Sequence, residues 1–222
     1  MKFKIDLKIF LFLILFYFTK QVETYIVIMV FAIIHELGHL VAGLALGMKP
    51  ESIKLMPYGL SISFKIIPED YNKKIGAGNL LEIKKIIVAT AGPLTNFLII
   101  LISSFLKINL FSNLIIIYSN FLIMVFNLIP TYPLDGGRIL KGILHILIGK
   151  KEAEKYVNNI SFITLLIITF LASIGIYYMK NIAIFFIVIF LWVLYITGDT
   201  IYKRRLKIYN LIEKTIEIRR DK

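Results

Sequence analysis

The chain has 222 residues, of which 58% are hydrophobic and 18% charged, and its mean hydropathy is +0.80. Soluble domains average roughly 45–50% apolar and about 25% charged residues, so this composition excludes an ordinary soluble domain and indicates a membrane protein. The absence of cysteine excludes disulfides, thiolate metal sites and a cysteine nucleophile, and the net charge of +12 does not indicate nucleic-acid binding, because the basic residues lie between apolar runs.

Six apolar segments approach the roughly 20 residues that a helix needs to cross the hydrocarbon core of a bilayer. In chain order they lie near residues 5–19, 25–48, 86–106, 110–129, 160–179 and 182–202. The first resembles the apolar part of a signal peptide, but no small-residue cleavage pattern follows it, so we predict an uncleaved span. The predicted fold class is an all-α polytopic membrane protein with about six transmembrane helices.

A different pattern occupies the segment between the second and third spans. ESIKLMPYGLSISFKI alternates apolar and polar residues on both sides of a Pro-Tyr-Gly turn, which predicts a small β-hairpin. No repeat and no Gly- or Pro-rich linker divides the chain. We therefore predict one membrane domain over residues 1–202 and a short basic tail over 203–222.

The basic residues are distributed unequally between the two sides of the predicted spans. Of the 26 Lys and Arg residues, 23 lie in the N-terminus, the second and fourth connections and the tail, and three lie in the opposite loops. Basic segments stay in the cytoplasm. Both termini are therefore predicted to be cytoplasmic in a multi-pass cell-membrane protein.

The second span contains the polar group HELGH within FAIIHELGHLVAGLALG. Polar and ionisable side chains are costly inside a membrane, so such a group indicates a functional site. His35 and His39 are four residues apart and share one helix face, where both imidazoles can bind one metal ion. Glu36 lies about 100° round the helix, and in H-E-x-x-H metalloproteases this glutamate is the general base for water activated by zinc.

A catalytic zinc usually has three protein ligands, and the candidates for the third are Asp135, His145, Asp199 and the loop carboxylates. Asp135 follows the fourth span in FNLIPTYPLDGGR. Two prolines there prevent a regular helix, and irregular backbone at membrane depth is tolerated where it lines a cavity. We therefore prefer Asp135, although a turn residue in D-G-G is the simpler alternative. His145 is predicted to lie in an interfacial amphipathic helix, and Asp199 in an interfacial charge network.

Amides occur in two of the apolar spans. Asn127, near the end of the fourth span, could stabilise the oxyanion of a tetrahedral intermediate or form an interhelical hydrogen bond, and the sequence favours neither. In the third span, ATAGPLTNFLI contains Gly92, Pro93 and Asn96. Packing against the HELGH helix accounts for these three residues without a chemical role.

HELGH, AGPLTN and NLIPTYPLDGG, in this order in successive spans, resemble the motifs of the site-2 intramembrane zinc metalloproteases, peptidase family M50. Six spans with HELGH in the second are most similar to the group of stage IV sporulation protein FB. The resemblance implies one zinc ion held by His35, His39 and Asp135, with Glu36 and Asn127 as catalytic residues.

The resemblance also implies peptide hydrolysis in or next to a membrane segment of a regulatory protein, such as a sporulation sigma-factor precursor. Inhibitory or regulatory membrane proteins are the implied partners, alongside the lipid bilayer. The chain departs from the group in having neither a CBS nor a PDZ domain in its 222 residues.

Two other classes of protein remain as alternatives. A CaaX-processing or HtpX-like protease shares HExxH but takes a glutamate from a later helix, and here Glu152 and Glu154 belong to the charged run KKEAEK. A zinc transporter or scaffold would use Glu36 as a ligand or packing residue. We further hypothesise that the hairpin between the second and third spans binds an extended substrate strand along its edge.

Overall fold

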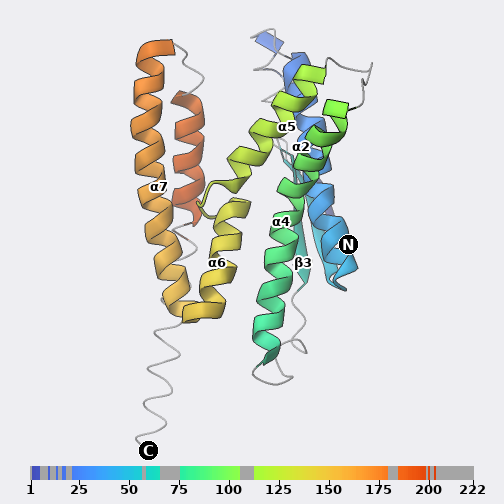
Figure 1. The fold of residues 1–222 in the computed structure, drawn as a ribbon, viewed down its shortest axis with the longest axis vertical. Coiled ribbons are helices and arrows are strands. Elements are labelled where there is room, and N and C mark those ends of the chain that lie inside the picture. Colours follow the sequence, from blue (N-terminus) through green and yellow to red (C-terminus); the bar gives the residue numbers. More distant parts are fainter. Residues whose placement is uncertain are drawn as a thin grey trace, which may run out of the picture. The chain divides into compact units, whose positions relative to one another are not determined.

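The structure is a computed structural model, in which the described part of the chain is mainly helical (Figure 1). The described residues are 2–5, 10, 14, 17, 18, 22–56, 59–65, 76–105, 113–179, 185–198, 200 and 203. The chain divides into two compact units, Met1–Leu128 and Ile129–Lys222. Each unit is described by itself.

Three helices pack against one another in the first unit: α2 (Val22–Ala45), α4 (Gly76–Phe105) and α5 (Asn113–Leu128). Val27 and Phe31 of α2 and Ile116 of α5 are buried together, and partly buried isoleucines surround them. This apolar cluster fixes the side of α2 that faces the other two helices.

Helix α2 has two different faces. One carries large apolar side chains that are exposed in the protein, at Ile26, Val30, Leu37, Val41 and Leu44. Their spacing of three, four and seven residues forms a continuous stripe along the helix, and such a stripe is suited to lipid rather than water. The HELGH histidines lie on the opposite, buried face of this helix.

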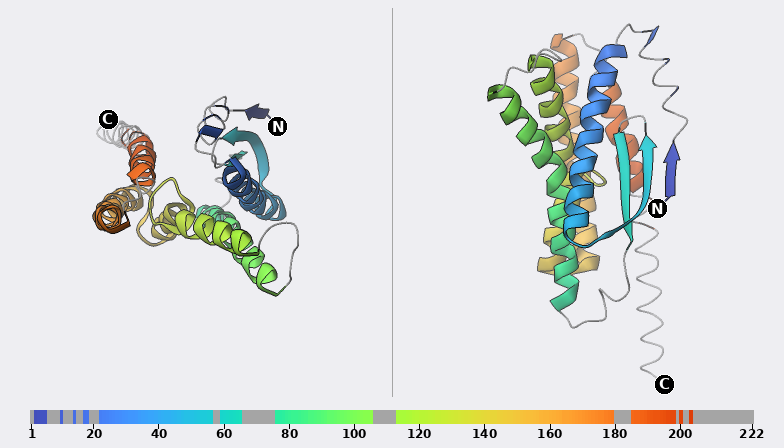
Figure 2. Two further views of the ribbon diagram at one scale, coloured as in Figure 1. Left: turned by 90° about the horizontal axis from the view of Figure 1, so that it is seen from above. Right: turned by 90° about the vertical axis from the view of Figure 1, so that its right-hand side faces the viewer.

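A three-stranded sheet lies against α2 (Figure 2). Its strands are β1 (Lys2–Ile5), β2 (Lys49–Met56) and β3 (Gly59–Lys65), with β2 in the centre. The antiparallel pairing of β2 and β3 confirms the predicted hairpin. The ring of Phe64 packs directly on Gly43 of α2, where any side chain larger than hydrogen would collide with it.

Strand β1 pairs in parallel with β2 and was not predicted. The prediction that a transmembrane helix begins at Ile5 is therefore wrong, because Ile5 belongs to this strand. Lys-Phe-Lys-Ile has the alternation of a strand, but its partner lies about fifty residues away in sequence. A local reading of the sequence does not reveal such pairing.

The second unit contains α6 (Asp135–Ile148), α7 (Lys150–Met179) and a further helix over Phe185–Gly198. The predicted amphipathic helix around His145 is confirmed as α6, which packs against α7 (Figure 1). Between these two helices, Lys141 donates to the buried carboxylate of Glu154 at 2.7 Å. Glu154 is thus a packed ion-pair partner, not part of a solvated charge run, and only Glu152 of that pair of glutamates is exposed.

Three described helices are long and apolar enough to cross a membrane, at Tyr25–Ala45, Asn79–Phe105 and Lys150–Tyr178. They correspond to the predicted second, third and fifth spans, although α4 and α7 begin ten residues earlier than expected. The predicted fourth and sixth spans correspond to shorter apolar helices, at Asn113–Leu128 and Phe185–Gly198. Most of the predicted first span and of the basic tail, and Asp199, lie outside the described residues, so the number of six spans stays a prediction.

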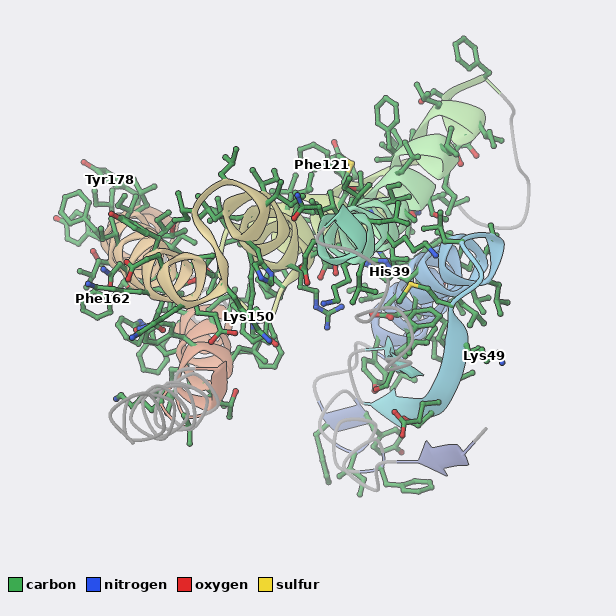
Figure 3. The ribbon with its side chains drawn as sticks, turned by 90° about the horizontal axis from the view of Figure 1, so that it is seen from below. His39, Lys49, Phe121, Lys150, Phe162 and Tyr178 are labelled. Carbon is green, nitrogen blue, oxygen red and sulfur yellow. The ribbon has the colours of Figure 1, made fainter. Side chains whose placement is uncertain are left out.

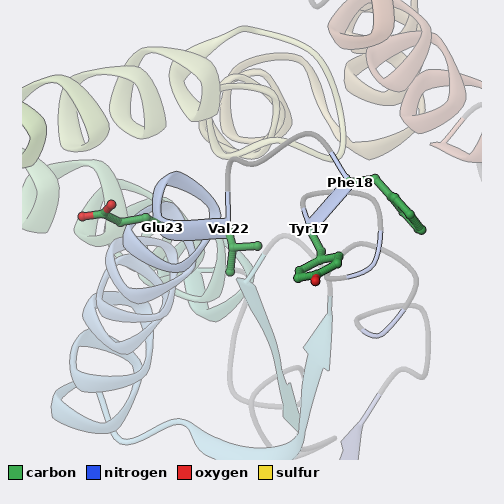
Figure 4. A pocket seen from close by; sticks show the side chains of 4 residues that line it. All are labelled: Tyr17, Phe18, Val22 and Glu23. Atoms are coloured by element: carbon green, nitrogen blue, oxygen red, sulfur yellow. The ribbon is translucent and has the colours of Figure 1, made fainter.

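A pocket of about 490 Å³ lies at the N-terminal end of α2, lined by Tyr17, Phe18, Val22 and Glu23 (Figure 4). Twelve residues separate Glu23 from His35, which is about 18 Å along a helix. This pocket is therefore remote from the HELGH group.

Candidate metal centre

His35 and His39 lie one turn apart on the buried face of α2, and their side chains point toward the same place. They are 2% and 3% exposed, and their Nε2 atoms are 3.2 Å apart. The two rings are nearly perpendicular, at 88°. Figure 3 shows His39 on the side of α2 that faces α4. The sequence prediction that the two imidazoles converge is confirmed.

The other ring nitrogen of each histidine makes a hydrogen bond to α4. His39 Nδ1 lies 2.6 Å from the carbonyl oxygen of Val88, and His35 Nδ1 lies 2.5 Å from the side-chain oxygen of Asn96. Because both partners are oxygen acceptors, both Nδ1 atoms carry the hydrogen. A neutral imidazole with its hydrogen on Nδ1 presents an unprotonated Nε2, the form in which imidazole binds a metal.

The spacing of the two Nε2 atoms fits zinc. Tetrahedral coordination with Zn–N bonds of about 2.0–2.1 Å places two nitrogen ligands about 3.3 Å apart, close to the 3.2 Å observed. In the Nδ1–H tautomer both lone pairs face the space between the rings, where one cation can accept both. The spacing and direction of the two nitrogens therefore suit a metal ion.

Helix α4 approaches the pair at Gly92, which has no side chain to occupy the space. A Cβ atom on Gly92 would lie 2.6 Å from His35 Nε2 and closer still to His39 Nε2. The next residue, Pro93, lies inside the helix and has no N–H, so it cannot donate a helical hydrogen bond at this turn. The predicted packing role of AGPLTN is thus confirmed for Gly92, because its missing side chain lets α4 lie close to the two histidine rings.

Glu36 is half-buried on α2, beside the histidine face. Its intermediate burial distinguishes it from the two fully buried imidazoles. Asn127, in α5, donates from Nδ2 to the carbonyl oxygen of Ile123 at 3.0 Å, one turn earlier in the same helix. An interhelical bond of Asn127, one of its two predicted roles, is therefore not the contact seen.

Asp135 lies in the second unit and is 4% exposed. It is the first residue of α6, which argues against the alternative of a turn residue in D-G-G. Arg138, one turn later, places a guanidinium nitrogen 3.5 Å from its carboxylate. The segment that precedes α6 is irregular, as its two prolines predicted.

Gly137, two residues after Asp135, allows a close contact with the backbone that precedes α6. Gly137 is helical, and a Cβ there would collide with the backbone of Thr131 and Tyr132. Its missing side chain lets the preceding segment fold back on the first turn of α6. His145, ten residues after Asp135 on the same helix, is half-buried.

Sequence reasoning missed the role of Asn96, and it did not consider Asn120 at all. Both amides are fully buried, and Asn96 bonds directly to His35. The available signal was an amide in each of two successive apolar spans, since polar side chains inside a membrane face the interior of the helix bundle. Which amide meets a histidine depends on how the helices pack.

Two imidazoles that converge in the middle of a helix apolar enough to cross a membrane form an H-E-x-x-H site of the kind that binds a metal ion. The sequence model of peptidase family M50 matches residues 104–171. The chain is similar to the site-2 proteases of this peptidase group.

The chain is similar to a zinc metalloprotease from Methanocaldococcus jannaschii, with 33% identity over 144 residues. That match covers 61% of the chain and 38% of the relative's length, so the chain spans less than half of this relative. It is also similar to the solved structure of a site-2 protease from the same organism, with a TM-score of 0.61 and 25% identity. This second match covers 89% of the chain and 91% of the solved one.

Proposed function

We propose that the protein is an intramembrane zinc metalloprotease, which hydrolyses a peptide bond in or next to a membrane segment of a regulatory protein. The observation that carries this proposal is the pair of buried Nε2 atoms of His35 and His39, 3.2 Å apart in the middle of a membrane-length helix. The match to the model of peptidase family M50 and the similarity to a zinc metalloprotease support the same activity.

His35, His39 and Asp135 are the proposed zinc ligands. Asp135 is preferred to His145 because its carboxylate is buried and comes from the PLDGG motif that follows α5. An aspartate oxygen with two imidazole nitrogens is a usual donor set for catalytic zinc. When bound, zinc polarises a carbonyl group and activates water near neutral pH.

The remaining catalytic groups are Glu36 and Asn127. Glu36 is proposed as the general base that takes a proton from the attacking water and passes it to the leaving amine. The amide nitrogen of Asn127 carries two hydrogens, and one of them bonds to Ile123. The second is the proposed donor to the oxyanion that forms on the substrate carbonyl.

The edge of β3 is the proposed site for an extended substrate segment. The described sheet has the order β1-β2-β3, so β3 has a strand neighbour on one side only, and it packs on α2 next to the histidine face. Phe64 holds β3 against Gly43, one helical turn beyond His39. Main-chain hydrogen bonds along this edge would bind a strand with little dependence on its sequence.

Proline substitutions at two neighbouring positions test this edge. Consecutive residues of a strand point their N–H groups to opposite sides. One of the variants Ile62→Pro and Ser63→Pro therefore removes a hydrogen bond to β2, and the other removes a donor at the outer edge. We expect one of the two variants to keep its zinc and fold while its cleavage falls. Equal loss of zinc and cleavage in both variants would exclude the edge as a substrate site.

The basic segments support an orientation in the cell membrane with both termini in the cytoplasm and a multi-pass topology. His35 is ten residues from each end of the span Tyr25–Ala45, which is about 15 Å along the helix. Membership of the sporulation group, with a sigma-factor precursor as substrate and inhibitory membrane partners, stays a prediction.

The test of the proposed function is a comparison of the wild type with Glu36→Gln and His39→Ala. Each variant is co-expressed with tagged single-span membrane proteins from the same genome, including a sigma-factor precursor. Cleavage is read by gel shift, and zinc by elemental analysis of the purified protein. We expect the wild type to cleave, Glu36→Gln to keep zinc without cleaving, and His39→Ala to lose both.

The same experiment separates a protease from a zinc transporter or scaffold. A transporter that uses Glu36 as a ligand would lose zinc affinity in the Glu36→Gln variant. A scaffold would bind zinc in the wild type and in the Glu36→Gln variant, and neither would cleave any of the tagged membrane proteins. Either result would argue against the proposed activity.

A further inference from the structure

A relay of buried amides connects α2, α4 and α5 behind the metal site. His35 Nδ1 on α2 donates to Asn96 Oδ1 on α4 at 2.5 Å, and Asn96 Nδ2 donates to Asn120 Oδ1 on α5 at 2.8 Å. Asn120 Nδ2 then donates to the backbone carbonyl of Ile116 at 2.8 Å. His35, Asn96 and Asn120 are each at most 2% exposed.

The relay has one direction, and its far end sets that direction. The carbonyl oxygen of Ile116 can only accept, so the amide nitrogen of Asn120 must face it and the oxygen of Asn120 must face Asn96. Asn96 must then turn its nitrogen toward Asn120 and its oxygen toward His35. An oxygen at this place accepts from His35 and holds the hydrogen on Nδ1.

This direction matters because the alternative arrangement would block the site. If Asn96 were flipped, its amide N–H would face His35 Nδ1, which would favour the tautomer that carries its hydrogen on Nε2. An Nε2–H cannot bind a metal. In a buried site, a mismatched amide also loses a hydrogen bond that water cannot replace.

We propose that Asn96 and Asn120 are positioning residues for the metal site, which fix the tautomer and the ring orientation of His35 from two neighbouring helices. The inference rests on the zinc site proposed above. Neither amide is a ligand. Asn96 acts on His35 directly, and Asn120 acts by fixing the orientation of Asn96.

The expected magnitude follows from similar partners of metal-binding histidines. Loss of the group that accepts the hydrogen of the other ring nitrogen typically weakens metal binding by about 10–100-fold. We expect this loss for Asn96→Ala. Asn96→Asp keeps an oxygen acceptor for His35 but loses the bond to the oxygen of Asn120, so it should recover part of the affinity. Asn120→Ala should show a smaller loss, because Asn96 can still accept from His35 but its orientation is no longer fixed.

The matched control is Ser103→Ala. Ser103 lies on α4, seven residues or two turns beyond Asn96, and is 1% exposed. Its hydroxyl has no hydrogen-bond partner among the described residues. Truncating it removes a buried polar group from the same helix without touching the relay. We expect its zinc affinity to equal that of the wild type.

Two measurements on the full chain in detergent test the proposal. The first is the zinc dissociation constant of each variant, obtained by competition with a chelator. The second is ¹⁵N NMR of histidine-labelled protein without metal, which reports which nitrogen of each ring carries hydrogen. The chain has three histidines, so the spectrum contains three imidazoles.

The proposal is supported if zinc affinity falls in Asn96→Ala, partly returns in Asn96→Asp and is unchanged in Ser103→Ala. The Nδ1–H signal of His35 should also be lost in Asn96→Ala. Wild-type affinity in Asn96→Ala, or equal losses in Asn96→Ala and Asn96→Asp, would overturn the proposal. If Asn96→Ala does not fold, the comparison of Asn96→Asp, Asn120→Ala and the control decides. A wild type with Nδ1–H on His35 but no zinc affinity would refute both the proposed zinc enzyme and this inference. In that case the Nδ1–H signal would show only that the hydrogen bond between His35 and Asn96 forms.

Discussion

Replacing Gly92 by alanine should abolish the metal site by adding a single methyl group. The Cβ atom of alanine would lie 2.6 Å from His35 Nε2, whereas ordinary contacts begin at 3.4 Å. The contact with His39 Nε2 would be closer still, so helix α4 or the imidazoles must move by at least about 0.8 Å. A metal site tolerates displacements of roughly 0.5 Å before its ligands lose productive geometry.

Two effects of this substitution can be separated. Overpacking of a well-packed interior costs about 1–3 kcal/mol of folding free energy, so the variant should be less stable but still fold. Zinc binding should fall by more than about 100-fold, since both Nε2 atoms are displaced at once and each tenfold loss is about 1.4 kcal/mol. Affinity is measured by chelator competition and stability by thermal unfolding of the metal-free protein.

Gly43→Ala is the matched control for the Gly92 variant. It adds the same methyl group to α2, one turn beyond His39, where the obstacle is the ring of Phe64 and not a metal ligand. We expect it to lose stability and to keep zinc. The reasoning would be refuted if Gly92→Ala bound zinc as tightly as Gly43→Ala does.

Three further outcomes follow from the structure. Gly137→Ala should reduce thermal stability by about 1–3 kcal/mol, because its Cβ would collide with the backbone before α6; wild-type melting would contradict this packing. Lys141→Met should cost about 3–5 kcal/mol because it removes the Lys141 cation from the buried carboxylate of Glu154, and adding Glu154→Leu should restore most of the loss. Equal stability of the single and double variants would contradict the coupling. A strong chelator should stop cleavage and added zinc should restore it, as measured with any substrate that the wild type cuts; full activity after chelation would exclude a metalloprotease.

The relay gives AGPLTN a chemical role that extends beyond helix packing. Gly92 and Asn96 are four residues apart on α4, so they lie on the same face of that helix. Gly92 leaves space at the Nε2 atoms, and Asn96 holds the opposite nitrogen of His35. One face of α4 thus contacts both nitrogens of His35: Gly92 leaves room beside Nε2, and the amide of Asn96 binds Nδ1.

The sequence by itself determined the membrane class, the helical convergence of His35 and His39, the hairpin after α2 and the amphipathic character of α6. These features depend on local composition and on the 3.6-residue and two-residue periods, which act within one element. HELGH could therefore be identified as a metal site before any packing was known, because two histidines four residues apart on an apolar helix face have few other uses.

Only the tertiary structure decided which groups stand behind and beside those histidines. Asn96 and Asn120 are 61 and 85 residues from His35, and strand β1 pairs with residues about fifty positions away. A single sequence contains no measure of such distances. The direction of the amide relay depends on a backbone carbonyl of a third helix, and the tautomer of His35 is therefore a property of how α2, α4 and α5 pack together.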